Sequence, residues 1–528
     1  MLFPSSRFKT SLLVIFAILA VQPVKPLIAK SKSEATQSMI KLIPGGAITL
    51  DLVLGLGYKR STQMALVRSQ KDLKGLALSQ VRAQSGLSGS LESSLVYVDD
   101  QMARQPNFPA PLSNINQSFK TNFRKAFSGG QSIDAGLSFN HVNTQWPAAG
   151  AFGAQGATDS KYYETQYEVG VSQSLWKNSF GEATKASLQA ARTRSNIIDA
   201  NVESSIGDWG EQITEVFYNA WQAQKNVEAQ KERLETQRRL EKITALSFKR
   251  GTVEKADLIN VRSQVLKSEE AVSEAKKALE DTWRYLVVAL NLPREFLQID
   301  PLYVPIKTLD YKATASEICA LPAGGSSDPS ARVSALKQQI EAARLDLNAA
   351  KSMAAPDLYV RAALKSNAML EGFGDSVGDG LATKNPQWLA MLGIKVDLGN
   401  DAAKAQIQKA ASDLKQLNLQ LVSLNDEIRV SLMNGCEELK RLDYFLNKQA
   451  KLIDMSLERQ KLDEQRFRLG RIDVGQVIIA ANDVITARFN FQLAQRSYAT
   501  TVWSLLNIKG QLAGRMIAAS KSPLLKGL

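Results

Sequence analysis

The sequence FKRGTV at residues 248–253 returns as FRLGRI at residues 467–472, which begins 219 positions further along the chain. In each copy a glycine follows a basic and apolar stretch, and glycine suits the left-handed position that ends a helix. The residues Thr252 and Asp473 then offer oxygen acceptors or negative charge near the start of a returning helix. We therefore predict two helical hairpins with their tips at these glycines.

Long amphipathic helices are predicted before both tips, over 182–250 and 401–469. Apolar residues recur there at spacings of four and three, the heptad pattern of helices wound around each other, with one stutter in the second segment. Each helix of about 65 residues would be on the order of 100 Å long at 1.5 Å per residue. Return helices are predicted at 254–291 and 474–508. The seam positions are Val202, Ile206, Trp209, Ile213, Val216, Ala220, Ala223 and Val227, then Leu414, Leu417, Leu421, Leu424, Ile428, Leu432, Gly435, Leu439, Leu442 and Leu446.

A different pattern precedes each long helix. Residues 167–175 and 392–398 alternate between apolar and polar side chains. Period two fits a barrel strand with a lipid face and a wet lumen face, but the alternation alone fits a small soluble sheet equally well. Partner strands are expected at 91–99, 133–143 and 357–366. Residues 119–143 are long enough to add a further strand pair. The Gly- and Asn-rich stretches 144–160 and 371–386 are predicted to be connecting loops.

The first residues indicate export from the cytoplasm. Arg7 and Lys9 precede the apolar run LLVIFAILAV at 12–21, which is shorter than the roughly 20 residues that span a bilayer, and small Ala29 follows. We expect a signal peptide at 1–29. No transmembrane helix is predicted after it, so membrane insertion would require a closed β-barrel.

The predicted organisation is a duplication. The expected segments are the signal peptide 1–29; a first repeat 30–290 with N-terminal helices, a strand hairpin at about 91–176, the long helix 182–250 and its return helix; a connector at 292–335; a second repeat 336–512 with a helix, a strand hairpin at about 357–398, the long helix 401–469 and its return helix; and a C-terminal tail at 513–528.

Composition argues against an enzyme. The 528 residues carry a net charge of +13 but contain one histidine and two cysteines, which excludes multi-histidine metal sites and thiolate clusters. No phosphate-binding loop or nucleophile elbow is present. His141 lies beside Asn140 and Asn143, where an exposed, non-catalytic position is expected. We therefore expect no enzymatic activity, no cofactor, no metal site and no nucleic-acid partner.

The ordered set of segments resembles the TolC-type outer-membrane efflux protein family. Residues 248–258 and 467–477 are similar to its aromatic-x-x-Gly-x-x-x-x-x-Asp-Val/Leu segment, and residues 342–358 resemble its junction between a helix and the second strand hairpin. The resemblance covers most of residues 60–512. It implies a mainly α fold with a membrane β-barrel, in which long antiparallel coiled-coil hairpins form a trimeric periplasmic helical barrel continuous with an outer-membrane β-barrel.

The resemblance also implies a function. A homotrimer in the Gram-negative outer membrane, surrounded by outer-membrane lipids and extending into the periplasm, would serve as the passive export conduit of a tripartite efflux or type I secretion system. Its partners would be a periplasmic adaptor and an inner-membrane pump. Two alternatives remain: an adaptor, which would need one hairpin inserted in compact β-domains, and a coiled-coil structural protein of the envelope, which would need no detergent.

By the same resemblance the hairpin tips are the functional region. Asp257 occupies the position of an aspartate that ties neighbouring hairpins together, whereas the matching arginine position falls on Ile472, beside Arg471. The positions of an aspartate ring fall on Gln476 and Ile479, so an apolar constriction at Ile479 would replace the ring. Adaptor contact is expected at Arg250, Gly251, Thr252, Val253, Leu469, Gly470, Arg471 and Ile472, and the gate candidates are Asp257, Arg471, Asp473, Gln476 and Ile479.

Two further features have two interpretations each. In the family the connector wraps the tunnel's midsection, so Cys319 in it and Cys436 in the second long helix would meet in an oxidising periplasm and form a disulfide; the alternative is two inert cysteines. The basic clusters at 249–250 and 466–471 favour an acidic cargo or adaptor, or are only solvated helix ends. Trp209, Trp221, Trp283 and Trp503 are expected to pack between helices.

Overall fold

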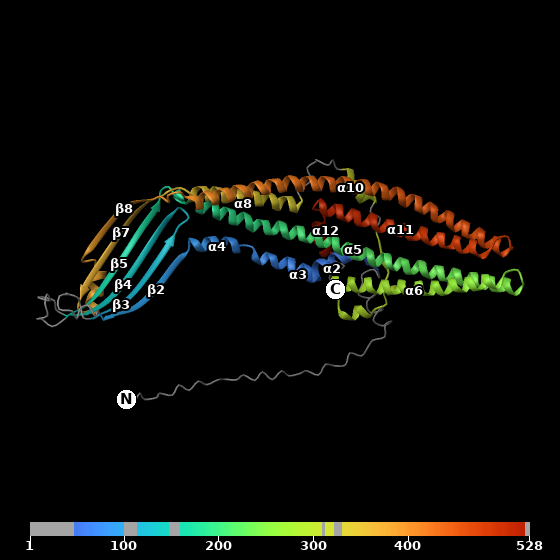
Figure 1. Ribbon diagram of the computed structural model, residues 1–528, viewed down its shortest axis with the longest axis horizontal. Coiled ribbons are helices and arrows are strands. Elements are labelled where there is room, and N and C mark those ends of the chain that lie inside the picture. Colours follow the sequence, from blue (N-terminus) through green and yellow to red (C-terminus); the bar gives the residue numbers. More distant parts are fainter. Residues whose placement is uncertain (1–46, 100–112, 147–158, 309–311, 321–329, 523–528) are drawn as a thin grey trace, which may run out of the picture.

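The computed structural model describes residues 47–99, 113–146, 159–308, 312–320 and 330–522. The predicted signal peptide lies outside these residues, as does most of the predicted loop 144–160. The molecule is elongated, with a β-sheet at one end and two helical hairpin tips at the other (Figure 1). Among the described residues, none of the helices combines the length and the hydropathy needed to cross a membrane.

Two helical hairpins run along the long axis. Helix α5 (Glu182–Lys249) and helix α10 (Asp401–Arg468) have 68 residues each, and their return helices α6 (Lys255–Ala289) and α11 (Val474–Ile508) have 35 each. Helix α8 (Ala331–Met353) packs between α5 and α10 on the sheet side of the return helices (Figure 1). The predicted helices 182–250 and 474–508 thus correspond closely to α5 and α11.

The two heptad seams are buried to different extents. Along α5, Val202, Ile206 and Ile213 are at most 5% exposed. Along α10, only Leu439 and Leu442 of the predicted seam are fully buried, and the other seam leucines are half-buried. The difference arises because α5 contacts α6, α8, α11, α12 and the N-terminal helices, whereas α10 contacts mainly α8 and α11.

The sheet has six strands, all antiparallel to their neighbours, in the order β2-β3-β4-β5-β7-β8. Pairing between β5 and β7, from Tyr163 opposite Leu370 to Ser174 opposite Tyr359, joins the two repeats. The strands are β2 (Leu87–Asp99), β3 (Ser113–Ala126), β4 (Gln131–Gln145), β5 (Ser160–Ser174), β7 (Asp357–Leu370) and β8 (Pro386–Lys395). The first repeat therefore supplies two strand pairs, and the further pair that the sequence left open is β3 with β4.

Two segments differ from their predictions. The stretch 371–386, predicted as a loop, contains helix α9 (Phe373–Leu381), and the predicted tail begins with helix α12 (Leu512–Ser520). Glycine-rich α9 has poor intrinsic helix propensity, so its packing against β5 and β7 stabilises the helix. Helix α12 buries Leu512 and Met516 against α2 and α5, which a reading as a solvated tail does not anticipate.

The largest core lies at the midsection, where α5, α6, α11, α12 and the connector meet. Its fully buried side chains include Phe217, Tyr218, Trp283 and Leu506. Trp209, Trp221, Trp283 and Trp503 all contribute to this core, as predicted. The remaining elements are β1 (Ile48–Thr49), α2 (Leu50–Arg60), α3 (Thr62–Ser69), α4 (Leu76–Gln84), β6 (Ile306–Lys307), α7 (Lys312–Ala320), and the short 3-10 helices Gln70–Leu73, Ser179–Gly181, Arg294–Gln298 and Pro301–Tyr303.

Candidate functional site: the hairpin tips and the midsection disulfide

Both hairpin tips end their long helix with the same hydrogen-bonded turn. Gly251 and Gly470 adopt φ values of +73° and +68°. In the first tip the Thr252 N–H donates to Ser247 O at 3.1 Å, and the Gly251 N–H donates to Phe248 O at 2.9 Å. The second tip repeats both bonds. This paired pattern is the Schellman motif, which satisfies the last carbonyls of a helix and needs a left-handed residue, and it explains the repeated glycine.

The starts of the return helices differ from the prediction at one residue. Asp473 caps α11 as expected, because its Oδ1 accepts the Gln476 N–H at 3.1 Å. In the first tip, however, Glu254 is the N-cap of α6, and it forms a capping box with Asp257. Thr252 instead donates its Oγ1 hydroxyl to Ser247 O at 3.0 Å. Thr252 therefore closes the C-terminus of α5, and its assignment to the start of α6 is wrong.

Within one chain the two tips pack against each other. A small apolar cluster joins Leu240 of α5 and Val261 of α6 to the second tip, with Val253 and Ile472 packed at its edge. The partners from the second tip are Phe467, Val474, Val477 and Ile478. The side chains predicted to contact an adaptor at 253 and 472 thus help to hold the two tips together.

Charged side chains also bridge the hairpins. Arg239 on α5 pairs with Glu464 on α10 at 3.1 Å, and Arg488 on α11 pairs with Glu232 on α5. Further up, Arg496 lies 3.6 Å from Glu215 and donates to Gln222 at 3.0 Å. One partner in each of these pairs is well exposed, so each pair contributes little stability alone, on the order of 0–1 kcal/mol. Together they bridge the two hairpins at several levels between the tips and the midsection.

The gate candidates do not form one cluster in a single chain. Asp257 is engaged in its own capping box, and no ion pair joins it to Arg471 within the described residues. Arg471, Asp473, Gln476 and Ile479 lie exposed around the second tip, with Ile479 55% exposed. Ile479 therefore points away from the core of its own hairpin, which leaves it available to a neighbouring copy or to an enclosed lumen.

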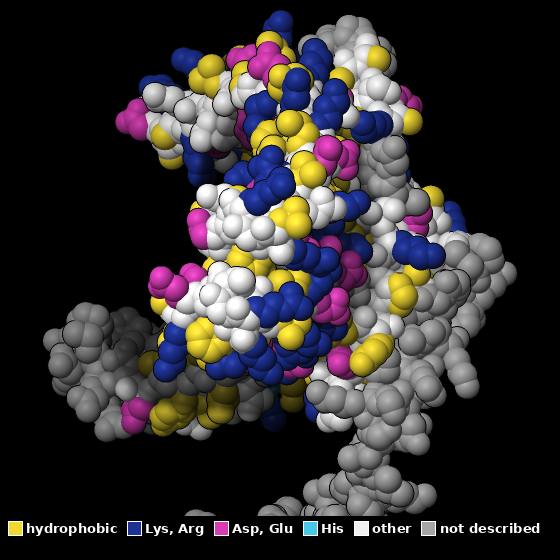
Figure 2. Space-filling view, turned by 90° about the vertical axis from the view of Figure 1, so that its right-hand side faces the viewer, with side chains coloured by type: hydrophobic (Ala, Val, Ile, Leu, Met, Phe, Trp, Pro, Cys, Tyr) yellow, Lys and Arg dark blue, Asp and Glu magenta, His cyan; other side chains and the backbone are white. Residues whose placement is uncertain are grey.

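The tip end carries an excess of basic side chains. In the view that looks at the tips, Lys and Arg are spread over the surface and outnumber Asp and Glu (Figure 2). Lys249, Arg250, Arg468 and Arg471 are all exposed. One nearby acidic group is already neutralised within the chain: the Asp463 carboxylate is 8% exposed and lies 3.5 Å from Arg459.

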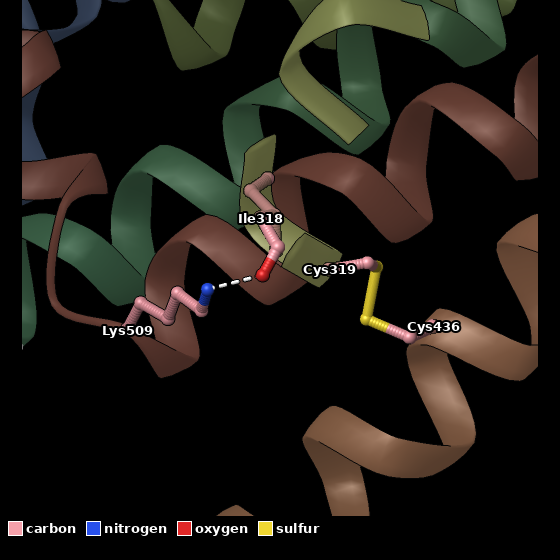
Figure 3. The surroundings of a disulfide bond; sticks show 4 residues. All are labelled: Ile318, Cys319, Cys436 and Lys509. Atoms are coloured by element: carbon pink, nitrogen blue, oxygen red, sulfur yellow. Dashed lines mark hydrogen bonds between the residues drawn. A yellow bond between two sulfur atoms is a disulfide. The ribbon is translucent and has the colours of Figure 1, made fainter. Parts of the chain in front are cut away.

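At the midsection a disulfide joins the connector to the second hairpin. Cys319 of α7 and Cys436 of α10 are bonded, with their Cα atoms 5.7 Å apart (Figure 3). Beside the bond, Lys509 at the end of α11 donates its Nζ to Ile318 O (Figure 3). Burial lowers the pKa of the Lys509 ammonium, an effect that Glu317 partly offsets. The connector is thus attached to both helices of the second hairpin.

The described residues contain no group of acidic, histidine or cysteine side chains that could hold a metal ion. His141 lies on β4, half-buried, where its ring stacks on Tyr163 with centroids 4.5 Å apart, and its Nδ1 lies 3.4 Å from Gln117 Oε1. This environment is a packing position on a sheet face.

Comparison with known proteins agrees with this architecture. Residues 132–292 match the family model described as outer membrane efflux protein. No match is found among curated proteins. The structure is similar to the outer membrane protein VceC of Vibrio cholerae, with a TM-score of 0.64 and 11% identity over 87% of this chain and 96% of that one.

Two further solved structures share the fold. The CmeC outer membrane channel of Campylobacter jejuni aligns with a TM-score of 0.60 and 13% identity, covering 89% of each chain. The MtrE outer membrane channel of Neisseria gonorrhoeae, solved in its open state, aligns with a TM-score of 0.57 and 14% identity over 88% of this chain and 89% of that one. The resemblance to TolC-type outer-membrane efflux proteins is confirmed, and the fold is that of these channels.

Proposed function

We propose that the chain is one protomer of an outer-membrane channel that provides a passive route across the periplasm and the outer membrane for an efflux or type I secretion system. One observation carries the proposal. A six-stranded antiparallel sheet with two outer strands continues directly into two tandem helical hairpins whose long helices have 68 residues each. Such helices would extend roughly 100 Å at 1.5 Å per residue.

The outer strands of the sheet support assembly with further copies. Strands β2 and β8 each have a neighbour on one side only among the described residues, and an unpaired edge readily adds another strand. We propose that β8 of one copy pairs with β2 of the next in a closed homotrimer. Three sheets of six strands would then give eighteen, an even number within the range of bacterial outer-membrane barrels.

The tips are the proposed contact with a periplasmic adaptor and, through it, an inner-membrane pump. The support is their position at the end of the molecule opposite the sheet (Figure 1) and their exposed basic side chains, which include Arg250 and Arg471. An adaptor surface with acidic groups would complement this charge. Neither hairpin is inserted in a compact β-domain, which is the feature that would favour an adaptor as the alternative.

Conductance across a planar bilayer tests the proposal and the gate together. Protein purified from outer membranes should give discrete channels. The Ile479→Ala variant should open more often, because a shorter apolar side chain favours wetting of a constriction. The matched control is Ile259→Ala on α6, a similarly exposed isoleucine at 57%, which should leave the openings unchanged.

Each outcome has a definite meaning. Channels that Ile479→Ala does not alter would retain the conduit and exclude Ile479 as its constriction. The absence of conductance, together with solubility in the absence of detergent, would reject the conduit in favour of a coiled-coil protein of the envelope.

A further inference from the structure

Helix α9 lies on one face of the sheet, at the end far from the hairpins. Ser376 is its main contact: the Ser376 Oγ lies 2.9 Å from Thr165 Oγ1 on β5 and donates to backbone carbonyls of β5 and β7. Ser366 on β7 donates its Oγ to Gly380 O at 2.7 Å. The helix therefore covers two hydroxyl side chains, and Thr165 and Ser366 are 0% and 3% exposed.

The strand register identifies which face α9 covers. Thr165 pairs with Phe139 and with Ala368, so these three side chains lie on the same face. The same alternation places Val169 and Val171 there, both exposed. The opposite face carries charges: Arg361 bonds Asp134 and Glu168 at 2.8 Å each, and Lys365 lies 3.1 Å from Glu168. Helix α9 thus packs on the apolar face.

On β7 and β8 a polar side chain interrupts the apolar face only where α9 covers it. Toward the hairpins, β7 and β8 present an unbroken apolar surface formed by Leu358, Val360, Ala362, Leu364, Trp388, Ala390, Leu392 and Ile394. Further from the hairpins, Ser366 and Thr165 share this face. A hydroxyl that met lipid directly without a hydrogen-bond partner would cost several kcal/mol. Helix α9 supplies the partners for both hydroxyls.

The outer surface of α9 is amphipathic. Phe373, Val377 and Leu381 recur every fourth residue along one flank, and Phe373 and Leu381 are 52% and 62% exposed. Asp375 and Asp379 lie on the other flank, where Asp379 pairs with Lys384. Phe373 also contacts Phe139 and Tyr163, with ring centroids 5.7 and 5.6 Å away. Aromatic girdles of this kind mark the level where a barrel wall meets the membrane interface.

We propose that α9 is a membrane-interface helix that completes the hydrophobic belt of the sheet, with bilayer acyl chains contacting Phe373, Val377 and Leu381. This inference rests on the proposed channel function. From Leu358 to Leu364 a strand tilted by about 40° rises only ~15 Å along the membrane normal, short of the ~25 Å belt of such barrels. Adding the stretch that α9 covers, up to Ala368, brings the rise to about 25 Å.

Site-directed fluorescence tests this inference. Because Cys319 and Cys436 are bonded to each other, a cysteine introduced elsewhere is the single free thiol. The variants Phe373→Cys and Leu381→Cys, labelled with a bimane probe in phosphatidylcholine vesicles, should be quenched at least twofold more by shallow-doxyl lipids than by aqueous iodide. Asp375→Cys on the opposite flank of α9 should show the reverse preference.

Labels at two positions on the sheet distinguish failure of this inference from failure of the proposed channel function. Leu392→Cys, near the hairpin-side edge of the apolar face, should be quenched by shallow-doxyl lipids, and Gln387→Cys on the polar face should not. If Leu392→Cys is lipid-quenched but the α9 labels respond only to iodide, the interface helix is refuted and the channel stands. If Leu392→Cys is itself not quenched by lipid, the apolar face does not meet the membrane and both proposals fail.

Discussion

At the scale of single residues, glycine is required at the two tips because of the backbone conformation there, and not because a side chain would lack space. A Cβ built on Gly251 or Gly470 would have no atom within 4 Å, yet both residues have positive φ. The helix glycines Gly210 and Gly435 show the opposite case, because a Cβ on Gly435 would come within 2.5 Å of Leu505. Gly435 therefore continues the heptad seam of α10 by letting a leucine from α11 occupy the space.

The variant Gly470→Ala should loosen the second tip. Holding alanine in the left-handed region costs roughly 1–2 kcal/mol, so the last turn of α10 will fray and exchange its amide protons several-fold faster. Hydrogen exchange followed over residues 466–476 measures this. Gly470→Asn should be milder, since asparagine tolerates the conformation better.

A matched control for this prediction is Gly514→Ala. Gly514 also has open space around its Cβ position, but it lies within helix α12 with ordinary φ, so alanine should be neutral or slightly stabilising. Equal exchange at the tip in Gly470→Ala and the native protein would show that the left-handed turn is not needed there.

At the scale of elements, the midsection depends on contacts between segments far apart in sequence. The disulfide closes a separation of 117 residues between α7 and α10. The chain-entropy model assigns a cross-link of this span an upper stabilisation of about 5 kcal/mol relative to the reduced chain. The Lys509 bond to Ile318 O holds the same connector against α11, so the connector would keep one attachment if the disulfide were removed.

The double variant Cys319→Ser with Cys436→Ser should lower thermal stability and release the connector first. We expect a clear decrease in Tm in detergent and faster proteolysis near residues 312–320, with the hairpin tips unaffected. The native protein treated with a reductant should behave in the same way. A double variant as resistant to protease as the oxidised protein would mean that the contacts of α7 alone hold the connector.

Sequence patterns predicted the elements that are specified by nearby residues and by a motif that occurs twice in the chain. The long helices follow from heptads, and their ends follow from Gly251 and Gly470. Helix α9 was missed because its stability depends on Thr165 and Ser366 on other strands, while its own sequence is rich in glycine. Thr252 was misassigned because a hydroxyl beside a tip can bond backward or forward, and only the geometry distinguishes these. The gate residues stay a prediction, because they would meet across copies.

At the scale of the whole molecule, the single chain leaves extensive apolar surface uncovered. Helix α10 exposes a second stripe of apolar side chains opposite its contacts with α8 and α11, including Val422, Val430 and Met433, each at least 51% exposed. A long helix with two apolar stripes is expected to be covered on both sides. We expect this stripe to contact the neighbouring copy in a trimer.

The variant Val430→Asp should therefore weaken assembly. Burying an unpaired carboxylate at an interface costs several kcal/mol, so the detergent-solubilised protein should shift from a trimer toward the monomer. Light scattering coupled to size exclusion measures this shift. Gln420→Asp, at an exposed polar position about 80° around the same helix from Val430, should remain trimeric. If both variants keep the trimer, this stripe of α10 is not the interface.

The packing of α12 on α2 has a consequence for the order of folding. Helix α2 spans Leu50–Arg60, and its partner α12 spans Leu512–Ser520, so this contact has nearly the largest sequence separation that the fold contains. Loop-closure entropy must be overcome before such a contact gains energy. As the chain is exported from its N-terminus, the hairpins can wind locally, whereas α2 has to wait for a helix that lies more than four hundred residues later in the sequence. The midsection is therefore the last region to fold. A chain truncated before α12 would form both hairpins but leave the midsection core incomplete.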